Sequence, residues 1–399
     1  MGKKKILVCS HWLELGGAEN ALLGLLEQLA QIDEYQVDLF LCRHSGPLMQ
    51  YIPKEINLLP EDPNAASVAV SARSAVQNRA YGVVFGRIWG KYQAKRWKKK
   101  NPGDANVAVE YSHRYTWRYV KPINPDIVYD AVLSFLAPHY IAACRTRGKQ
   151  KIAWVHTDYQ TMSIDSDTER CVWEKFDQIV GVSQQCVNSF VKAIPSASDR
   201  VMELENIMPI NMIRKIIGPV HPEEMDKSYI RILSVGRYAY AKNFDNVPDI
   251  CKRIVGTGLN VKWYIIGYGG DEALIKQKIQ EAGMEDRVIL LGKKDNPYPY
   301  IAACDLYVQP SRYEGKCVAV REAQMLGKTV VITRYATSAS QLEDGVDGVI
   351  VPMDNEGCAQ GIAALLRDPE RMQKLAETCR QRDYTNGQEV EKLSKLLED

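Results

Sequence analysis

The sequence predicts an α/β fold made of two domains, each built around a parallel β-sheet. A short apolar strand at residues 5–10 (KILVCS) is followed by an amphipathic helix at 21–30 and a second strand at 35–42. This strand–helix–strand order is typical of a parallel sheet covered by helices. The same kind of pattern starts again near residue 229, and 399 residues are enough for two domains.

The domain boundaries follow from the place where the pattern restarts. Six short apolar runs, most of them separated by helices, lie within residues 229–352. The two patterns are joined by residues 208–228, which contain prolines and charged side chains. We therefore place the domains at residues 1–210 and 211–381, and we expect the last helix, at about 382–399, to pack back on the first domain.

Composition excludes several classes of protein. Lys and Arg number 51 against 49 Asp and Glu, so the overall charge gives no indication of nucleic-acid binding. No apolar run approaches the roughly 18 residues that a membrane-spanning helix needs, and the N-terminal run is too short for a signal peptide. The ten cysteines show no CxxC pair and no zinc-ligand spacing, which predicts buried, reduced thiols. We expect a cytoplasmic protein, or one peripheral on the inner face of the cell membrane.

A basic segment follows a predicted helical region at 60–105. Lysines and arginines are dense from Lys91 to Lys100, and Trp89, Tyr92 and Trp97 are interleaved with them. One interpretation is a solvated helix face. The other is that 89–100 docks on an anionic membrane surface or on an acceptor, because basic residues beside interfacial aromatic rings suit anionic headgroups.

The strongest motif is a loop that leads from a strand into a helix. The strand ends at Gln309, the loop carries Glu314 and Gly315, and Glu322 lies about two turns into the helix. The helix start offers unpaired N–H groups and the positive end of the helix dipole, which favour a diphosphate. A carboxylate at the loop can accept hydrogen bonds from sugar hydroxyls, and the deeper Glu322 can accept them from ribose hydroxyls.

Two cationic side chains follow the first strand of the second domain. Arg237 and Lys242 are of the types that bind phosphate, Arg through a bidentate fork and Lys as a point charge. The alternative is surface salt-bridging. Such a pair could replace a divalent metal, and we expect no metal site. The acidic triplet at 165–167 (DSD) has the letters of a metal motif but lies in a polar stretch that we interpret as a surface loop.

Two further features lie where the strands of the first domain end. Gly16 and Gly17 follow the first strand and allow close approach of the backbone to a ligand, although a plain turn explains them equally. His156 ends the strand KIAWVH, and strand ends in open α/β sheets border the ligand crevice. Asp158, close behind His156, is expected to face the acceptor. His113 is expected at the surface or on the acceptor side.

Taken together, these motifs resemble the retaining family 4 glycosyltransferases, whose GT-B fold has two Rossmann-like domains facing a cleft. Residues 310–324 (PSRYEGKCVAVREAQ) are similar to the glutamate–seven–glutamate motif of that family, and 234–245 (SVGRYAYAKNFD) to its Gly-Arg…Lys-Asn segment. Residues 15–20 (LGGAEN) resemble its first glycine loop. Two further segments, 263–275 and 344–352, resemble the elements that follow these motifs. The residues of these motifs are most similar to those of bacterial enzymes that build capsule or other surface polysaccharides.

The resemblance implies a reaction and a set of residues. A sugar passes from a nucleoside diphosphate sugar, which we expect to be a UDP-sugar, to a hydroxyl of a saccharide or lipid-linked acceptor, with retention of anomeric configuration. Arg237 and Lys242 would hold the donor diphosphate, Glu314 the sugar hydroxyls, and His156 the donor sugar. No cofactor is required beyond the donor substrate. The donor-binding set implied is Gly16, Gly17, Arg237, Lys242, Gly315, Lys316, Cys317, Val318 and Glu322.

The sequence departs from the family pattern at two places. Lys316 and Cys317 stand where the family usually has a large apolar residue and then glycine or proline, although their backbone amides still suit phosphate. The helix N-terminus and Lys316 would stabilise a reactive thiolate at Cys317. Residues 205–209 (ENIMP) resemble the interdomain turn of the family but lack its glycine.

Three other functions remain open from the sequence. An epimerase or hydrolase acting on nucleotide sugars has the same fold but needs further acid and base residues. A nicotinamide oxidoreductase needs a GxGxxG loop, whereas GYGG at 267–270 is followed by Asp271. A non-catalytic partner protein would be expected to have lost Glu314, Arg237 or Lys242.

Overall fold

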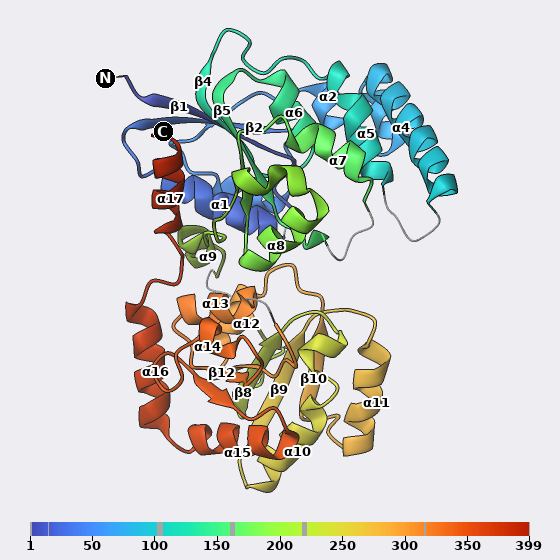
Figure 1. The fold of residues 1–399 in the computed structure, drawn as a ribbon. Helices are drawn as coiled ribbons and strands as arrows, with labels where there is room; N and C mark the ends of the chain where they lie inside the picture. The colour runs from blue at the N-terminus through green and yellow to red at the C-terminus, as the bar shows by residue number, and fades with distance from the viewer. Residues whose placement is uncertain are drawn as a thin grey trace. The chain divides into compact units, whose positions relative to one another are not determined.

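The computed structural model describes residues 2–14, 16–101, 107–159, 164–217, 222–314 and 317–398. The chain divides into two compact units: the first is formed by Met1–Pro209 with Asn386–Asp399, and the second by Ile210–Thr385 (Figure 1).

The first unit contains a parallel sheet of seven strands in the order β3-β2-β1-β4-β5-β6-β7. The central strand β1 has a continuous apolar run, and Ile6, Leu7 and Val8 are fully buried, as expected for a parallel strand covered on both faces. The strands are β1 (Lys4–Ser10), β2 (Tyr35–Leu41), β3 (Asn57–Leu58), β4 (Tyr129–Ser134), β5 (Gly148–Val155), β6 (Gln178–Gly181) and β7 (Val201–Glu203).

Helices surround this sheet, and the predicted helical region at 60–105 is divided among three of them. The helices are α1 (Gly17–Leu29), α2 (Pro63–Ala66), α3 (Ala72–Gln77), α4 (Tyr81–Lys100), α5 (Ala108–Thr116), α6 (His139–Arg145), α7 (Ser166–Trp173) and α8 (Gln184–Ala193). The helices α4 and α5 lie side by side at the edge of the unit (Figure 1). In the parts of the chain described above, no helix combines the length and the apolar content needed to cross a membrane.

The C-terminal helix α17 (Glu389–Leu396) belongs to the first unit and contacts α1. The Lys4 ammonium donates a hydrogen bond to the Leu397 carbonyl at 2.9 Å. The Glu205 N–H donates to the Glu389 carboxylate at 3.0 Å, and the Asn386 amide donates to the Asn206 carbonyl at 3.2 Å. The segment resembling an interdomain turn is therefore tied to the end of the chain.

The second unit contains a parallel sheet of six strands in the order β10-β9-β8-β11-β12-β13. Its strands are β8 (Ile230–Val235), β9 (Val261–Ile266), β10 (Val288–Gly292), β11 (Leu306–Gln309), β12 (Val330–Thr333) and β13 (Val349–Val351). Its helices are α9 (Ile210–Ile217), α10 (Val247–Gly256), α11 (Glu272–Ala282), α12 (Tyr298–Ala303), α13 (Val318–Met325), α14 (Ser338–Gln341), α15 (Asn355–Leu366) and α16 (Pro369–Gln381). Two Rossmann-like α/β sheets are thus present, as the sequence predicts.

Both sheets reverse their strand order at one point, between β1 and β4 in the first unit and between β8 and β11 in the second. Ligands of open α/β sheets bind outside the carboxyl ends of the strands at such points. A buried hydrogen-bond chain holds this point in the second sheet: the Trp263 indole N–H donates to Ser234 Oγ at 2.9 Å, and that hydroxyl donates to the Val308 carbonyl at 2.5 Å. The loops that follow β8 and β11 therefore start from fixed positions.

The predicted surface loop at 165–167 is wrong. Asp165 is buried and forms the N-cap of α7, where its carboxylate accepts a hydrogen bond from the Asp167 N–H at 3.2 Å. It also accepts from the Tyr111 hydroxyl at 2.6 Å and from Thr168 Oγ1 at 2.8 Å. This acidic triplet is a helix cap that also connects α5 to α7, because a short carboxylate satisfies the unpaired N–H groups of a helix start.

Candidate functional site

The second unit brings together residues from the loops after β8 and β11. Lys242 Nζ lies 2.5 Å from Glu314 Oε1, and Ser311 Oγ donates to the same carboxylate oxygen at 2.6 Å. Both charged side chains are largely buried, with 17% and 11% of their surface exposed. The sequence predicts both residues as site residues, and the structure shows that they form an ion pair with each other.

A second ion pair fixes the backbone of these loops. The Arg312 guanidinium makes two hydrogen bonds to the Asp245 carboxylate, at 2.9 and 2.7 Å, and its backbone N–H donates to the Ala241 carbonyl at 2.8 Å. Its guanidinium also lies over the Tyr240 ring, 4.1 Å from the centroid. The bidentate geometry gives orientation as well as energy. Sequence reasoning missed this pair, although both residues lie inside the quoted motifs.

A close backbone contact joins the loop after β9 to the loop after β8. A Cβ placed on Gly267 would lie 1.9 Å from the Gly236 carbonyl oxygen, so only glycine fits at this position. Gly267 of the GYGG segment thus allows the two loops to pack closely, next to Arg237. Arg237 is exposed, and no hydrogen bond or ion pair links its side chain to any residue in the described ranges. It is available to an anion.

The start of α13 differs from the prediction for Cys317. Cys317 is the residue before the helix, and its N–H donates to Gln341 Oε1 at 2.7 Å. Burial raises the pKa of the Cys317 thiol to about 11, and the opposing effect of Lys242, whose Nζ lies 4.0 Å from the sulfur, does not reverse it. The thiol is therefore protonated at neutral pH, and the expectation of a reactive thiolate is wrong. Its predicted neighbours Gly315 and Lys316 lie outside the described residues, whereas Val318 is exposed at the first position of the helix.

Glu322 points into the protein. Only 7% of its surface is exposed, and its Oε1 accepts a hydrogen bond from the Tyr298 hydroxyl at 2.9 Å. Desolvation raises the pKa of Glu322 to about 7. The structure does not bring Glu322 into contact with Lys242 or Glu314, so its predicted contact with ribose remains a prediction.

In the first unit, a cavity of about 360 Å³ lies at the carboxyl ends of β4 and β5. Three histidines line it. His156 follows β5 directly, and its Nε2 lies 2.9 Å from the Phe135 carbonyl oxygen. Because a carbonyl only accepts, this nitrogen carries the proton and Nδ1 remains as an acceptor. Burial lowers the pKa of His156 to about 4, and burial likewise lowers the pKa values of His113 and His139 to about 3.

Two carboxyl groups line the same cavity. Glu110 Oε2 is buried without a hydrogen-bond partner among the described residues. Burial, reinforced by the nearby Glu169 and Asp165, raises the pKa of Glu110 to about 8. Glu169 accepts hydrogen bonds from the Tyr159 hydroxyl and the Trp173 indole, both at 2.7 Å, and burial raises its pKa as well. At neutral pH Glu110 is a neutral carboxylic acid, so it is able to donate a hydrogen bond.

His113, which the sequence places at the surface or on the acceptor side, is half-buried in α5 and lines the cavity. Sequence reasoning also missed Glu110, His139 and Glu169. Only His139 carries a usable signal, since it follows the end of β4 at a turn. Asp158 follows two residues after His156, which lines the cavity. Its carboxylate accepts a hydrogen bond from the Gln185 side-chain amide at 2.7 Å.

The glycine loop after β1 leads into α1. Gly16 is the N-cap of this helix, and a Cβ placed there would lie 2.2 Å from Glu19 Oε2. Gly17 begins the helix and has open space around the position of a Cβ. The helix start is therefore accessible to a ligand beside Gly17. No group of three His, Cys, Asp or Glu side chains within the described ranges is placed to hold a metal ion.

Comparison with known proteins finds similarity to glycosyltransferases. Residues 221–382 match the family model described as "Glycosyl transferases group 1". The chain is 26% identical over 191 residues to the lipopolysaccharide core biosynthesis glycosyltransferase LpsE of Rhizobium meliloti. The aligned residues cover 46% of this chain and 55% of LpsE. It is 30% identical over 164 residues to the Campylobacter jejuni N-acetylgalactosamine-N,N'-diacetylbacillosaminyl-diphospho-undecaprenol 4-alpha-N-acetylgalactosaminyltransferase, covering 41% of this chain and 43% of that protein.

The fold match extends over almost the whole chain. The crystal structure of Anabaena HepE in complex with UDP and glucose superposes with a TM-score of 0.59 at 18% identity, covering 98% of this chain and 100% of HepE. By sequence, however, the chain spans only about half the length of the two curated relatives. The two Rossmann-like sheets are thus of the GT-B type, and the match to the group 1 glycosyltransferase model lies within the second unit.

Proposed function

We propose that this protein is a glycosyltransferase that moves a sugar from a nucleoside diphosphate sugar to a hydroxyl group during surface polysaccharide synthesis. The observation that carries the proposal is the Lys242–Glu314 pair beyond β8 and β11, inside the segment that matches the group 1 family. The second unit would bind the donor and the first unit the acceptor, with the boundary near residues 210 and 211. Similar proteins act in lipopolysaccharide core synthesis and on a diphospho-undecaprenol acceptor, as their names state.

The donor site is proposed to work by exchange of partners at Lys242. In the structure its ammonium is neutralised by Glu314. A donor diphosphate would replace the carboxylate beside Nζ and would gain the exposed Arg237 as a second cation. Glu314 would then accept hydrogen bonds from the sugar hydroxyls. The complex of HepE with UDP and glucose supports UDP as the nucleotide.

The reaction is proposed to retain the anomeric configuration by front-face substitution. The bond from the anomeric carbon to the diphosphate oxygen breaks, and the acceptor oxygen forms its bond to the same face. The acceptor proton passes to an oxygen of the departing diphosphate. Lys242, Arg237 and the amides at the start of α13 stabilise the negative charge that develops, which is the main catalytic contribution of such a site. These groups would make a metal ion unnecessary.

The cavity of the first unit suits a neutral saccharide acceptor. Its histidines are held neutral by burial, and Glu110 is held as the protonated acid. Neutral donors and acceptors beside Trp173 match sugar hydroxyls and the apolar face of a sugar ring. We infer that His156 contacts the transferred sugar and that Asp158 lies on the acceptor side. Membership of family 4, a role in capsule synthesis and a cytoplasmic, peripheral location belong to the same proposal.

The test is a binding screen followed by a product assay. The purified chain is melted with UDP, GDP, ADP, their sugars and NAD(H), with and without magnesium, because a ligand of the folded state raises the melting temperature. A rise with one nucleoside diphosphate and its sugars, which Lys242→Ala removes, supports the donor site. Stabilisation by NAD(H) alone would overturn the proposal. Conversion of the sugar without transfer to any added acceptor would favour the epimerase or hydrolase instead.

A further inference from the structure

One helix of the first unit exposes large apolar side chains to an unusual extent. On α4, the exposed fractions are 63% for Tyr81, 61% for Phe85, 63% for Ile88, 43% for Trp89 and 55% for Tyr92. These residues follow one another at intervals of one, three and four, so they lie on one side of the helix, here called the outer face of α4. Contiguous exposed apolar surface of this kind marks an interaction site.

The opposite side of α4 is built from small residues. Gly82, Gly86, Gly90 and Ala94 recur at every fourth position and are buried or half-buried. A Cβ on Gly86 would lie 2.8 Å from the Tyr115 carbonyl oxygen, and one on Gly90 would lie 2.8 Å from that of Tyr111. The glycines thus allow α4 to pack closely on α5. The usual arrangement is inverted, with small residues inward and large apolar residues outward, so the outer face does not serve the core of the unit.

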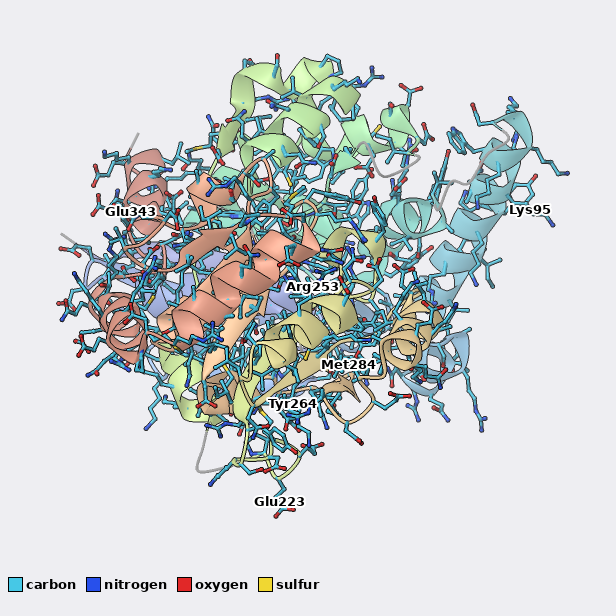
Figure 2. All side chains as sticks on the ribbon, turned by 90° about the horizontal axis from the view of Figure 1, so that it is seen from below. Lys95, Glu223, Arg253, Tyr264, Met284 and Glu343 are labelled. Atoms are coloured by element: carbon cyan, nitrogen blue, oxygen red, sulfur yellow. The ribbon has the colours of Figure 1, made fainter. Side chains whose placement is uncertain are left out.

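Positive charge is concentrated on the same helix. α4 carries seven Lys and Arg residues and no Asp or Glu, whereas the whole chain is nearly balanced, with 51 basic and 49 acidic residues. Lys95, Arg96 and Lys99 lie seven positions after Ile88, Trp89 and Tyr92, so they continue the outer face. None of these three cations forms an ion pair with the described part of the protein. Lys95 extends outward from the helix (Figure 2).

These features together select one kind of partner. We propose that the outer face of α4 docks on the surface of an anionic lipid bilayer, with Phe85, Ile88 and Trp89 at the acyl boundary and the basic residues at the headgroups. Rings and long apolar side chains beside Lys and Arg are the composition of helices that lie in the membrane interface. A second copy of the chain fits less well, because two such faces would bring like charges together.

A hollow beside the outer face supports this orientation. Phe85, Trp89, Arg118 and Tyr119 border a depression of about 370 Å³ between α4 and the turn after α5. It combines apolar walls with a guanidinium, which suits a lipid headgroup and the start of its acyl chain. The sequence indicates residues 89–100 as the candidate membrane segment, and the structure moves the apolar part back to Tyr81. This inference rests on the peripheral location included in the proposed function and names the surface responsible for it, and its test requires no sugar transfer.

The test uses the full chain and vesicles without any sugar donor. Vesicles of phosphatidylcholine alone are compared with vesicles containing equal amounts of phosphatidylcholine and phosphatidylglycerol, and bound protein is measured by co-sedimentation. We expect binding to the anionic vesicles only. Combined Lys95→Gln, Arg96→Gln and Lys99→Gln should weaken binding roughly 100-fold at low salt. The effect should shrink as salt is added, because surface charges are screened.

A second variant tests the apolar part. Combined Phe85→Ser, Ile88→Ser and Tyr92→Ser should remove vesicle binding, since these side chains supply the buried area. A matched control, Val128→Ser with Leu274→Ser and Met353→Ser, changes three side chains of 45%, 40% and 46% exposure elsewhere. The charge control, Lys54→Gln with Lys192→Gln and Lys227→Gln, changes net charge equally at other exposed positions. Both controls should bind vesicles like the wild type.

Several outcomes would overturn the proposal. They are equal binding of the wild type to neutral vesicles, no binding to anionic vesicles, or unchanged binding after the apolar triple substitution. Size-exclusion chromatography gives a further one: a wild-type dimer that the apolar triple substitution converts to a monomer would show that a second copy covers the outer face. All variants are checked for an unchanged circular dichroism spectrum and for stabilisation by UDP. A variant of the outer face that loses vesicle binding but is still stabilised by UDP would show that membrane docking and donor binding are separate properties. Failure of one would then not imply failure of the other.

Discussion

The two units place different chemistry at the carboxyl ends of their parallel strands. In the second unit, beyond β8 and β11, Lys242 and Glu314 form an ion pair and Arg237 is exposed as a further cation. In the first unit, beyond β4 and β5, burial keeps the histidines neutral and keeps Glu110 protonated. One site holds fixed charge and the other suppresses it. This difference suits an anionic diphosphate in one unit and uncharged hydroxyls in the other.

The largest expected effect comes from removing the fixed charge. Lys242→Ala should lower kcat by about 1000-fold or more, because a preorganised cation aimed at developing negative charge contributes on this scale. The rate is measured as donor-dependent product formation at saturating acceptor. Lys276→Ala, which changes an exposed lysine of α11, is the control. If the Lys242→Ala variant keeps the kcat of the wild type, Lys242 does not act as a fixed charge in catalysis. The proposed contrast between a charged and a neutral site would then be wrong.

The next effect concerns the neutral site. The pKa of Glu110 is raised from 4.5 to about 8 in the folded protein, so the folded state binds the proton more tightly than the unfolded state. The contribution of Glu110 to the free energy of unfolding is therefore full below pH 4.5 and is lost as pH rises through about 8. Glu110→Gln should flatten this part of the stability profile, measured by urea unfolding across that pH window.

Glu110→Gln keeps a neutral hydrogen-bonding group, whereas Glu110→Ala removes it. We expect Glu110→Ala to raise the KM for the acceptor several-fold, with little change in kcat, because the lost interaction is an ordinary hydrogen bond. A stability profile unchanged by Glu110→Gln would show that Glu110 is ionised at neutral pH, and the two sites would then be alike.

A smaller effect is expected at the ion pair that supports the charged site. Arg312→Lys keeps the charge but loses the two parallel hydrogen bonds to Asp245. Both side chains are about one-fifth exposed, and the expected loss of stability is about 1 kcal/mol. Activity should fall about tenfold because the loops after β8 and β11 lose their fixed relation. Thermal unfolding and initial rates measure the two quantities, and full activity would show that Asp245 does not orient the site.

The smallest effect is expected from chelation. If Lys242 and Arg237 supply the positive charge at the diphosphate, EDTA should leave the transfer rate unchanged. Initial rates with EDTA are compared with rates in added magnesium. A strong dependence on magnesium would mean that the protein cations alone do not stabilise the leaving group.

The fold class could be read from the sequence because its signal is local. Apolar runs such as Ile6–Val8 and the helix between them and β2 define a buried parallel strand from a few residues. Lys242 and Glu314 could also be named, since each lies in a short motif after a strand. Their contact could not, because they are separated by 72 positions and only the pairing of β8 with β11 brings the two loops together.

Other properties depended on how deeply individual side chains are buried. A sequence indicates only the average burial of each residue type and not the burial of a particular side chain. Cys317 has the position of a reactive thiol, yet desolvation raises its pKa to about 11. Glu110 gave no signal, because its neutral state arises from the cavity that α5 and α7 enclose. The sequence by itself determined the alternation of elements, the phosphate-binding residue types and the basic, aromatic composition of α4. The tertiary structure decided which side of α4 is exposed, because only glycine fits where the α5 backbone approaches α4 closely.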